Sequence, residues 1–404
     1  PPPPPSNTPR PPPTHTLRRS RRQRQMCIRD RAVFGQTYGL EVPNYFARGD
    51  EERFETPSFR RSNAWDATRR EVHAVRTAVG LNEVHNFSKF RVTGTGARRW
   101  LDRVMAGRIP KPGRMALSPM LSPRGRLFGD FTIACLSSSE FYLTASYGSQ
   151  DFHSRWFDTH AEPDVSVENV SDRVTGFQIA GPNARLLLQR VSSSDVSPES
   201  FRFLDVKLMT IGMVECRVQR VSYAGDLGYE IYCDLLSQRE LFDTLWAAGR
   251  DLGLTPFGMR AMMSLRLDRF FGSWQREYSP DYTAAETGLD RFIDFKKQVD
   301  FIGRTIAERE KAEPPERQLC AFEVDAHDAD IVGYEPIWCR GEVVGFCTSG
   351  GYSHWLDKSI AFGFLPRCEG ANVGPFEVEI LGERRSAVKL VASGFDPSGE
   401  RMRG

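Results

Sequence analysis

A turn in the middle of the chain carries residues suited to binding a polar ligand. Residues 222–230 read SYAGDLGYE, between two runs whose apolar residues alternate as they do in strands. Alternate side chains of a strand point to the same side, so Glu230 and Tyr232 share one face, and Tyr229, Ile231 and Cys233 share the other. A carboxylate beside an aromatic ring can accept hydrogen bonds from a ligand and pack against it. The same pattern also fits an ordinary strand face on the surface.

Two further charged residues are candidates for chemistry. Asp130 follows Gly129 and precedes Phe131 and Ile133, so it lies at the start of an apolar strand. An acid there is often merely solvated, but it could also hold a proton for a reaction. Arg260 lies in the segment GMRAMMSLRLDRFFGSW, which otherwise suits a buried helix. Its guanidinium could bind a ligand, or its stem could simply cover apolar surface.

Other common chemistries lack their motifs. The pair Gly94 and Gly96 has no third glycine for a dinucleotide loop, and the chain contains no GxxxxGK[ST] and no GxSxG. Its 8 cysteines include no CxxC, and its 7 histidines include no HExxH. We therefore expect neither a metal site nor a redox site, and widely spaced thiols in strand patterns fit a reducing compartment.

The positive charge of the chain is local. The net charge of the 404 residues is +2, but residues 1–31 alone hold 9 prolines, 8 arginines and a single acid, Asp30. The remainder, with 46 basic and 51 acidic residues, is mildly acidic, which argues against a nucleic-acid surface. The first 31 residues are expected to be disordered, as a basic arm, an Arg-rich transit peptide or, as we favour, non-native sequence. No run is long and apolar enough to span a bilayer.

Periodicity predicts a mixed α+β body followed by an all-β domain. Apolar spacing predicts helices near 67–79 and 96–106 and a helix over 184–191, and alternation predicts a hairpin across Leu136 to Glu140. A strand is expected from Val214 to Tyr223, returning through 229–233, and Ser237 with Glu240 predicts a capping box. Beyond about 315 short strands dominate, which indicates a small barrel or sandwich.

The order of several segments resembles a known family. GRLFGDFTIA, FYLTAS, SYAGDLGYEIY, GMRAMMSLRLDRFFGSWQREYSPDYTAAETGLDRFI and VVGFCTSGGYS look like the tetrahydrofolate-binding family of the glycine-cleavage aminomethyltransferase. More narrowly, YGLEVPNYFA, SFRRSN and GSWQREYSPDYT are similar to the C-terminal folate half of dimethylglycine and sarcosine dehydrogenases. The resemblance covers about residues 38–400. It implies an aminomethyltransferase-like folate-binding body over 63–312 and a C-terminal β-barrel over 313–404.

The resemblance also implies roles for five residues. It makes Asp130 the catalytic acid that orients or activates the folate amines during one-carbon transfer. It makes Tyr142, Tyr223 and Glu230 residues that bind tetrahydrofolate, with Glu230 accepting from the pterin, and it matches Arg260 to the arginine of the family's ARDSLRLE segment. The sequence departs from the family at Asn86 and Phe90, where an aspartate and a methionine are usual, so one wall of the pocket is expected to differ.

The implied function is one half of a two-part reaction. A flavin domain, with FAD, would oxidise an N-methyl amine, and this half would trap the carbon as 5,10-methylenetetrahydrofolate. The chain has no dinucleotide loop, so we expect a fragment in which residues 32–62 are a linker from the flavin domain, in the bacterial cytoplasm or mitochondrial matrix. The alternatives are a stand-alone aminomethyltransferase, a folate-binding module without turnover, and an α+β protein that uses none of these residues.

Overall fold

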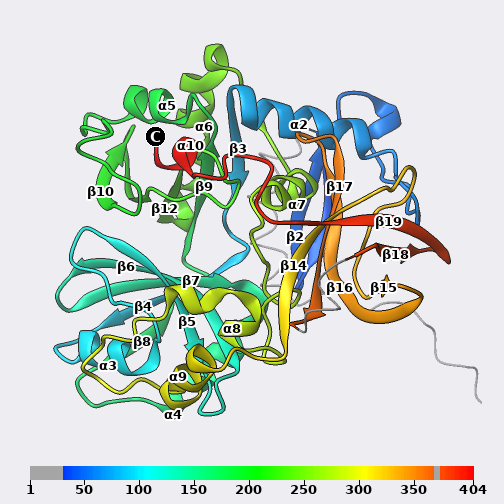
Figure 1. Ribbon diagram of the computed structural model, residues 1–404. Coiled ribbons are helices and arrows are strands. Elements are labelled where there is room, and N and C mark those ends of the chain that lie inside the picture. Colours follow the sequence, from blue (N-terminus) through cyan, green and yellow to red (C-terminus); the bar gives the residue numbers. More distant parts are fainter. Residues whose placement is uncertain (1–30, 368–373) are drawn as a thin grey trace, which may run out of the picture.

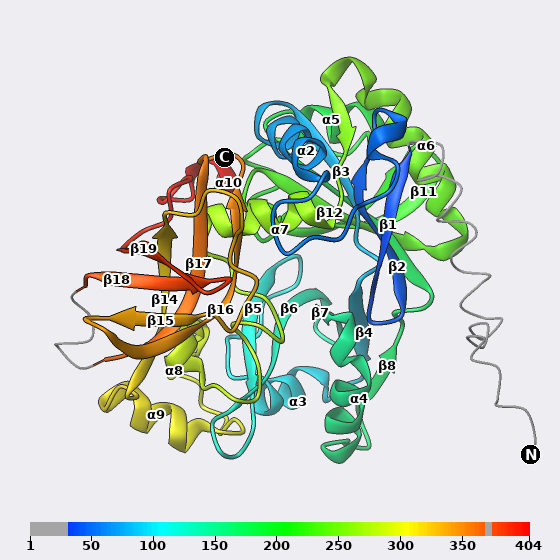
Figure 2. The same cartoon turned by 90° about the vertical axis from the view of Figure 1, so that its right-hand side faces the viewer.

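The chain folds into two open sheets and a closed barrel. The computed structural model describes residues 31–367 and 374–404, so the predicted N-terminal arm lies outside it except for Arg31. Figure 1 shows the two open sheets one above the other, and Figure 2 shows the barrel on one side and both sheets on the other. The mixed body and all-β end predicted from the sequence are confirmed.

The first sheet has six strands and is covered by helices on one face. Helices α5 (Ala184–Val191) and α6 (Gln238–Gly249) bury leucines against it, because their apolar residues recur at helical spacing. Its strands pair antiparallel except for the last pair, which is parallel. In spatial order they are β10 (Val206–Ile211), β11 (Val214–Gln219), β12 (Gly228–Asp234), β9 (Val174–Ala180), β3 (Val79–Glu83) and β13 (Leu254–Pro256).

The second sheet has five strands and its own helical cover. Helices α3 (Ala97–Val104) and α4 (Gln150–Thr159) contribute Trp100 and Phe157 to a core on one face. The predicted hairpin across 136–140 is confirmed as the turn between two strands of this sheet. In spatial order the strands are β5 (Met115–Leu121), β6 (Leu127–Ser137), β7 (Glu140–Ser146), β4 (Phe87–Thr93) and β8 (Ser166–Asn169).

Three local predictions were wrong in detail. The helix expected at 67–79 is α2 (Trp65–Thr77), because Ala78 leaves helical geometry and Val79 starts β3. Strand β11 ends at Gln219, and Tyr223 lies in the loop beyond it. Ser237 makes no cap because a 3-10 turn, η3 (Leu235–Ser237), already precedes α6 and is itself capped by Asp234.

The capping box of the described chain lies elsewhere. The Thr283 hydroxyl accepts from the backbone N–H of Glu286, and the Glu286 carboxylate accepts from the N–H of Thr283, at the start of α8 (Ala284–Thr287). The remaining short helices are η1 (Asp50–Glu52), η2 (Tyr147–Ser149), η4 (Arg250–Leu252), η5 (Leu289–Phe292), α9 (Arg304–Ala312) and α10 (Glu400–Arg403).

The segment expected to be a linker is folded onto the body. Residues 32–46 form a hairpin of β1 (Ala32–Thr37) and β2 (Leu40–Phe46), in which Tyr45 is fully buried. The buried Glu71 carboxylate accepts from the N–H of Phe46 at 2.6 Å and of Gly258 at 2.8 Å. This carboxylate ties the hairpin to the start of α7 (Met259–Asp268), so part of the expected linker has a fixed place in the fold.

The C-terminal strands close into the predicted barrel. In order around it they are β14 (Arg317–Val324), β17 (Lys358–Pro366), β16 (Glu342–Ser353), β15 (Pro336–Cys339), β18 (Phe376–Ile380) and β19 (Glu383–Leu390). The barrel is fastened by a buried ion pair between Arg266 on α7 and Glu277, 3.0 Å apart. Glu277 also accepts from the hydroxyls of Thr348 and Ser349 on β16. The GSWQREYSPDYT segment thus joins body and barrel.

Candidate functional site

The face of the six-stranded sheet that its helices leave uncovered carries a row of buried polar side chains. Asn82, Gln178, Glu230 and Gln219 pair in register across β3, β9, β12 and β11. Each is at most 8 % exposed. Burying a polar group costs free energy unless it is hydrogen-bonded, so a core that needed only stability would have apolar residues here. The row therefore indicates a function for this face.

A second polar face belongs to the five-stranded sheet. Paired residues of antiparallel strands point to the same side, so Thr132 of β6, Thr144 of β7 and Lys89 of β4 share a face. Asp130 and Tyr142 lie two positions from Thr132 and Thr144 on the same strands, and so project from that face too. The opposite face of the sheet carries the apolar core beneath α3 and α4.

The two polar faces meet at Arg217. Its guanidinium carbon lies 3.7 Å from the ring centre of Tyr142 on the other sheet and 4.9 Å from that of Tyr232 on its own sheet. The Tyr232 hydroxyl donates to Glu230 Oε2 at 2.7 Å. The predicted shared face of Glu230 and Tyr232 is confirmed, and Tyr142 is connected to them through one cation–π sandwich.

Glu230 is poised to change its charge near neutral pH. Burial raises the pKa of its carboxyl from 4.5 to about 7, although the hydrogen bond from Tyr232 and the positive charges of Lys89 and Arg217 oppose this shift. The same burial lowers the pKa of Arg217. A carboxylate with two nearby cations and one hydroxyl donor can still accept two further donors from a ligand.

Asp130 lies on the other polar face, that of the five-stranded sheet. Surrounding protein raises the pKa of its carboxyl from 3.8 to about 7, while part of the residue stays accessible to solvent. Asp130 lies close enough to Tyr223 and Tyr278 for its negative charge to raise the pKa of both phenols. A carboxyl with a pKa near 7 can both hold and accept a proton at physiological pH, as general acid–base chemistry requires.

Tyr223 reaches Asp130 from the loop after β11. Its hydroxyl donates to the carbonyl oxygen of Gly272 at 2.7 Å, and its ring stacks on Phe271 with centres 6.0 Å apart. Burial is the main cause that raises the pKa of the phenol to about 12, so it stays neutral. The loop therefore holds a half-buried aromatic ring beside the carboxyl.

The fifth predicted residue, Arg260, is not brought to this place. It is 46 % exposed and forms an ion pair with Glu55 in the N-terminal segment. The structure pairs Arg260 with Glu55, and a role of Arg260 toward folate stays a prediction.

The structure also shows where Asn86 and Phe90, the two departures from the family pattern, lie. Phe90 pairs with Leu143 on the apolar side of the five-stranded sheet and packs edge-on against Phe157, 5.2 Å away. It therefore does not line the polar face, and the expected change in that wall is wrong for Phe90. Asn86 lies beside the sulfur of Met259 at 3.6 Å.

Sequence reasoning missed several members of the site. Arg217 and Gln219 alternate with Val214, Cys216 and Val218, which is also the pattern of a solvent-exposed strand face. Lys89, Gln178 and Tyr278 gave no local signal. Only the meeting of two sheets turns these polar residues inward, and no spacing within one strand reveals that.

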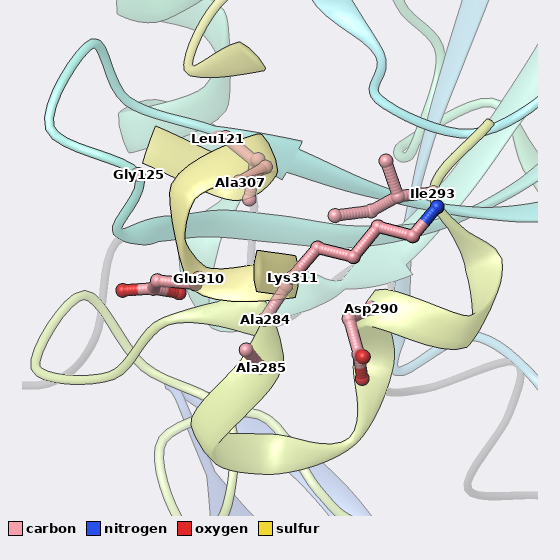
Figure 3. Close-up of a pocket in the computed structure, with 9 residues that line it drawn as sticks. All are labelled: Leu121, Gly125, Ala284, Ala285, Asp290, Ile293, Ala307, Glu310 and Lys311. Atoms are coloured by element: carbon pink, nitrogen blue, oxygen red, sulfur yellow. The ribbon is translucent and has the colours of Figure 1, made fainter. Parts of the chain in front are cut away.

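One small hollow of the described chain lies away from these polar faces. Figure 3 shows a small hollow between α8, α9 and the β5–β6 turn. It is lined by Leu121, Gly125, Ala284, Ala285, Asp290, Ile293, Ala307, Glu310 and Lys311. Within residues 31–367 and 374–404, no three His, Cys, Asp or Glu side chains gather as metal ligands. None of the helices described is long and apolar enough to cross a membrane.

Two open sheets with opposed polar faces and a closed barrel define the aminomethyltransferase-like class of fold. The chain matches the GCVT N-terminal domain over residues 24–297 and the glycine cleavage T-protein C-terminal barrel domain over residues 317–396. It therefore belongs to the glycine cleavage T-protein family. The fold and family predicted from the sequence are confirmed.

Two relatives and one solved structure illustrate what the chain is similar to. Human mitochondrial dimethylglycine dehydrogenase is 34 % identical over 89 % of this chain, which spans 42 % of that protein's length. The aminomethyltransferase of a Geobacillus strain is 29 % identical over 82 % of this chain and 91 % of its own. The crystal structure of aminomethyltransferase T from Bartonella henselae covers 90 % of this chain with a TM-score of 0.77 and 18 % identity, which shows the shared fold.

Proposed function

We propose that the chain binds tetrahydrofolate between its two polar sheet faces and transfers a one-carbon unit to it. The observation that carries this proposal is the buried carboxylate of Glu230 opposite the face that bears Asp130. Family membership supports it, since the chain shares both domains of the glycine cleavage T-protein. The residues fit the ligand: a pterin edge offers an N–H and an amino group, and a carboxylate accepts from both.

Asp130 would act on the reacting amine. Tetrahydrofolate supplies the two amines that capture a carbon at the oxidation level of formaldehyde. Forming two N–C bonds to formaldehyde releases one water, and each amine gives up one proton. With its pKa raised to about 7, the Asp130 carboxyl can take one of these protons and return it to the departing oxygen. Fixing both reactants between the sheets supplies much of the remaining rate.

The aromatic residues would hold the ring system. Tyr223 is half-buried and stacked on Phe271, and Tyr142 is held in place by the Arg217 guanidinium. Rings fixed in this way lose little freedom when a flat ligand packs on them.

The source of the carbon is a further part of the proposal. Dimethylglycine dehydrogenase is the relative with the higher identity, and this chain spans less than half of it. We infer a parent protein in which a flavin domain with FAD oxidises an N-methyl amine and passes the carbon to this half. The names of such relatives favour a mitochondrial location, for which we propose the matrix, while the bacterial aminomethyltransferases are compatible with a cytoplasmic one.

Two alternatives have support of their own. A stand-alone aminomethyltransferase is favoured by the Geobacillus relative, of which the chain covers 91 %. A binding module without turnover is favoured by the mouse pyruvate dehydrogenase phosphatase regulatory subunit, which is 25 % identical over 87 % of this chain and is named for regulation. Asp130→Asn distinguishes an enzyme from a binding module: the substitution should abolish one-carbon transfer by an enzyme, whereas a binding module shows no such activity in the parent chain either.

Calorimetric titration of the full chain with tetrahydrofolate, under anaerobic conditions, tests the proposal. We expect saturable binding that Glu230→Gln weakens about 10- to 100-fold, since hydrogen bonds to a charged group contribute about 1.5–3 kcal/mol. Glu215→Gln is the matched control, because Glu215 lies on the same strand face as Arg217 and is exposed. Absence of binding at millimolar tetrahydrofolate would refute the proposed function.

A further inference from the structure

The carboxylate of Glu230 does not stand alone in its row. Its direct neighbours in register are Gln219 on β11 and Gln178 on β9, so an amide flanks it on each side. Adjacent strands lie about 4.8 Å apart, which places the three side chains next to one another on one face. All three are buried, Gln219 completely.

The hydrogen bonds of these amides are incomplete. Neither the Nε2 nor the Oε1 of Gln219 has a hydrogen-bond partner among the described residues. Gln178 donates one N–H to the Ser222 hydroxyl at 2.9 Å, and a primary amide has a second N–H. By contrast, Asn82 at the end of the row donates to the Phe257 carbonyl at 2.7 Å and is part of the scaffold. A buried amide without partners is costly, so Gln219 requires an explanation that the fold does not give.

A flat heterocyclic ligand whose edge carries donors and acceptors in the right order would supply the missing hydrogen bonds of all three residues. The edge of a 2-amino-4-oxopyrimidine ring presents, in order, a ring nitrogen acceptor, an amino donor, an N–H donor and a carbonyl acceptor. A carboxylate satisfies the two central donors, and an amide N–H on each side satisfies the two outer acceptors. The order amide, carboxylate, amide in the row is complementary to this edge.

We propose that Gln178, Glu230 and Gln219 together recognise a fused 2-amino-4-oxopyrimidine by hydrogen bonds to its edge. In this arrangement the Gln219 amide donates to the outer acceptor on its side. This inference rests on the proposed function and adds two specificity-determining residues to it. It also explains why Gln219 is left without a protein partner, since its partner is the ligand. Arg217, from the same strand, stays with Tyr142 and Tyr232 and has no part in the reading.

Gln219→Met tests the inference, because methionine keeps the length of the side chain and removes its donors. Calorimetry with tetrahydrofolate should give about tenfold weaker binding to this variant, as expected for an acceptor left buried and unpaired. Glu215→Gln, on the same strand face, should bind like the parent chain. Thermal unfolding without ligand should show Gln219→Met to be at least as stable, because it removes an unsatisfied amide.

Two analogues of tetrahydrofolate then identify the bond. One lacks the 4-oxygen and the other has carbon in place of the N1 nitrogen. The tenfold difference between the parent and Gln219→Met should disappear with the analogue that lacks the acceptor of Gln219 and persist with the other. A difference that persists with both analogues, or no difference with tetrahydrofolate, would overturn the inference.

The outcomes separate this inference from the proposed function. If Glu230→Gln weakens tetrahydrofolate binding and Gln219→Met does not, the folate site stands and the reading by Gln219 is refuted. If the parent chain binds no tetrahydrofolate, the proposed function is refuted before the variants are compared. Guanosine has the same edge, so if the parent chain binds guanosine and not tetrahydrofolate, the same comparison is made with guanosine: tenfold weaker binding to Gln219→Met would support recognition of the edge while the folate site is refuted, and equal binding would overturn both.

Discussion

The Glu230 carboxyl should lower the stability of the unliganded protein at alkaline pH. Its pKa is about 7 in the fold, against an ordinary value of 4.5, because burial disfavours the charged form. Between these two values the folded chain binds more protons than the unfolded chain, so the free energy of unfolding falls as pH rises through that window. The contribution is small below pH 4.5 and reaches its full, unfavourable size above pH 7.

The size of this effect follows from the shift. With pKa values of about 7 and 4.5, linkage gives a loss of about 2–3 kcal/mol between pH 5 and pH 8. Glu230→Gln cannot titrate, and its carbonyl can still accept from the Tyr232 hydroxyl. When the pH is raised from 5 to 8, the free energy of unfolding of the variant should therefore rise by about 2–3 kcal/mol relative to that of the parent, whatever the two values are at pH 5.

Urea unfolding of both chains at pH 5 and pH 8, without ligand, measures this double difference. Glu215→Gln serves as the control, because an exposed carboxylate should show almost no such difference. A potentiometric difference titration of the folded parent and Glu230→Gln provides a second measurement. The reasoning is refuted if the titrating group has a midpoint near 4.5, or if the stability difference is independent of pH.

Four other substitutions test the site and its frame. Asp130→Asn should abolish one-carbon transfer from formaldehyde above the spontaneous rate and leave the Kd for tetrahydrofolate within about threefold, and unchanged turnover would exclude Asp130 from catalysis. Arg217→Met should raise the pKa of Glu230 further by removing a facing cation, which a shifted midpoint in the difference titration would reveal. Arg260→Ala should leave the tetrahydrofolate Kd unchanged in calorimetry, because Arg260 is exposed and paired with Glu55; a tenfold loss would return it to the site. Glu277→Gln should lower the free energy of unfolding in urea by about 3–5 kcal/mol, since it leaves Arg266 buried without its counter-ion, and a wild-type midpoint would contradict this.

The sequence predicted those features that depend on local pattern. Period-two alternation predicted the β6–β7 hairpin and the shared face of Glu230 and Tyr232. The loss of helical period predicted an all-β domain, barrel or sandwich, and the family resemblance chose the barrel. The end of β11 was predicted too far along, because Val221 and Tyr223 continue the alternation although the chain leaves the sheet at Gln219. Alternation reports which residues could face a core, but it does not say where strand pairing stops.

The site could be predicted only in part, because its residues are brought together by two sheets. The acids were found because each stands beside a glycine-containing turn or an apolar strand, and the resemblance added Tyr142 and Tyr223. Arg217 and Gln219 were not found, because a buried polar strand face and a solvated one have the same sequence pattern. Arg260 was matched through the resemblance, and in the structure it pairs with Glu55, a contact between segments far apart in the sequence that no local pattern reveals.

Burying the polar groups of the site lowers the stability of the unliganded chain. Arg217 and Gln219 are buried with polar atoms that have no hydrogen-bond partner, whereas Arg76 and Arg266 are buried with a carboxylate beside each guanidinium, although the Nε of each also lacks a partner. Arg76 pairs with Asp268 at 2.7 Å and Arg266 with Glu277 at 3.0 Å, and these two pairs hold α2 and the barrel to α7. Buried ion pairs thus fix the frame, while the polar sheet faces hold buried groups without partners, as at Arg217 and Gln219. That distribution is expected if a ligand completes the row in the folded protein, because binding then recovers the free energy that the empty site gives up.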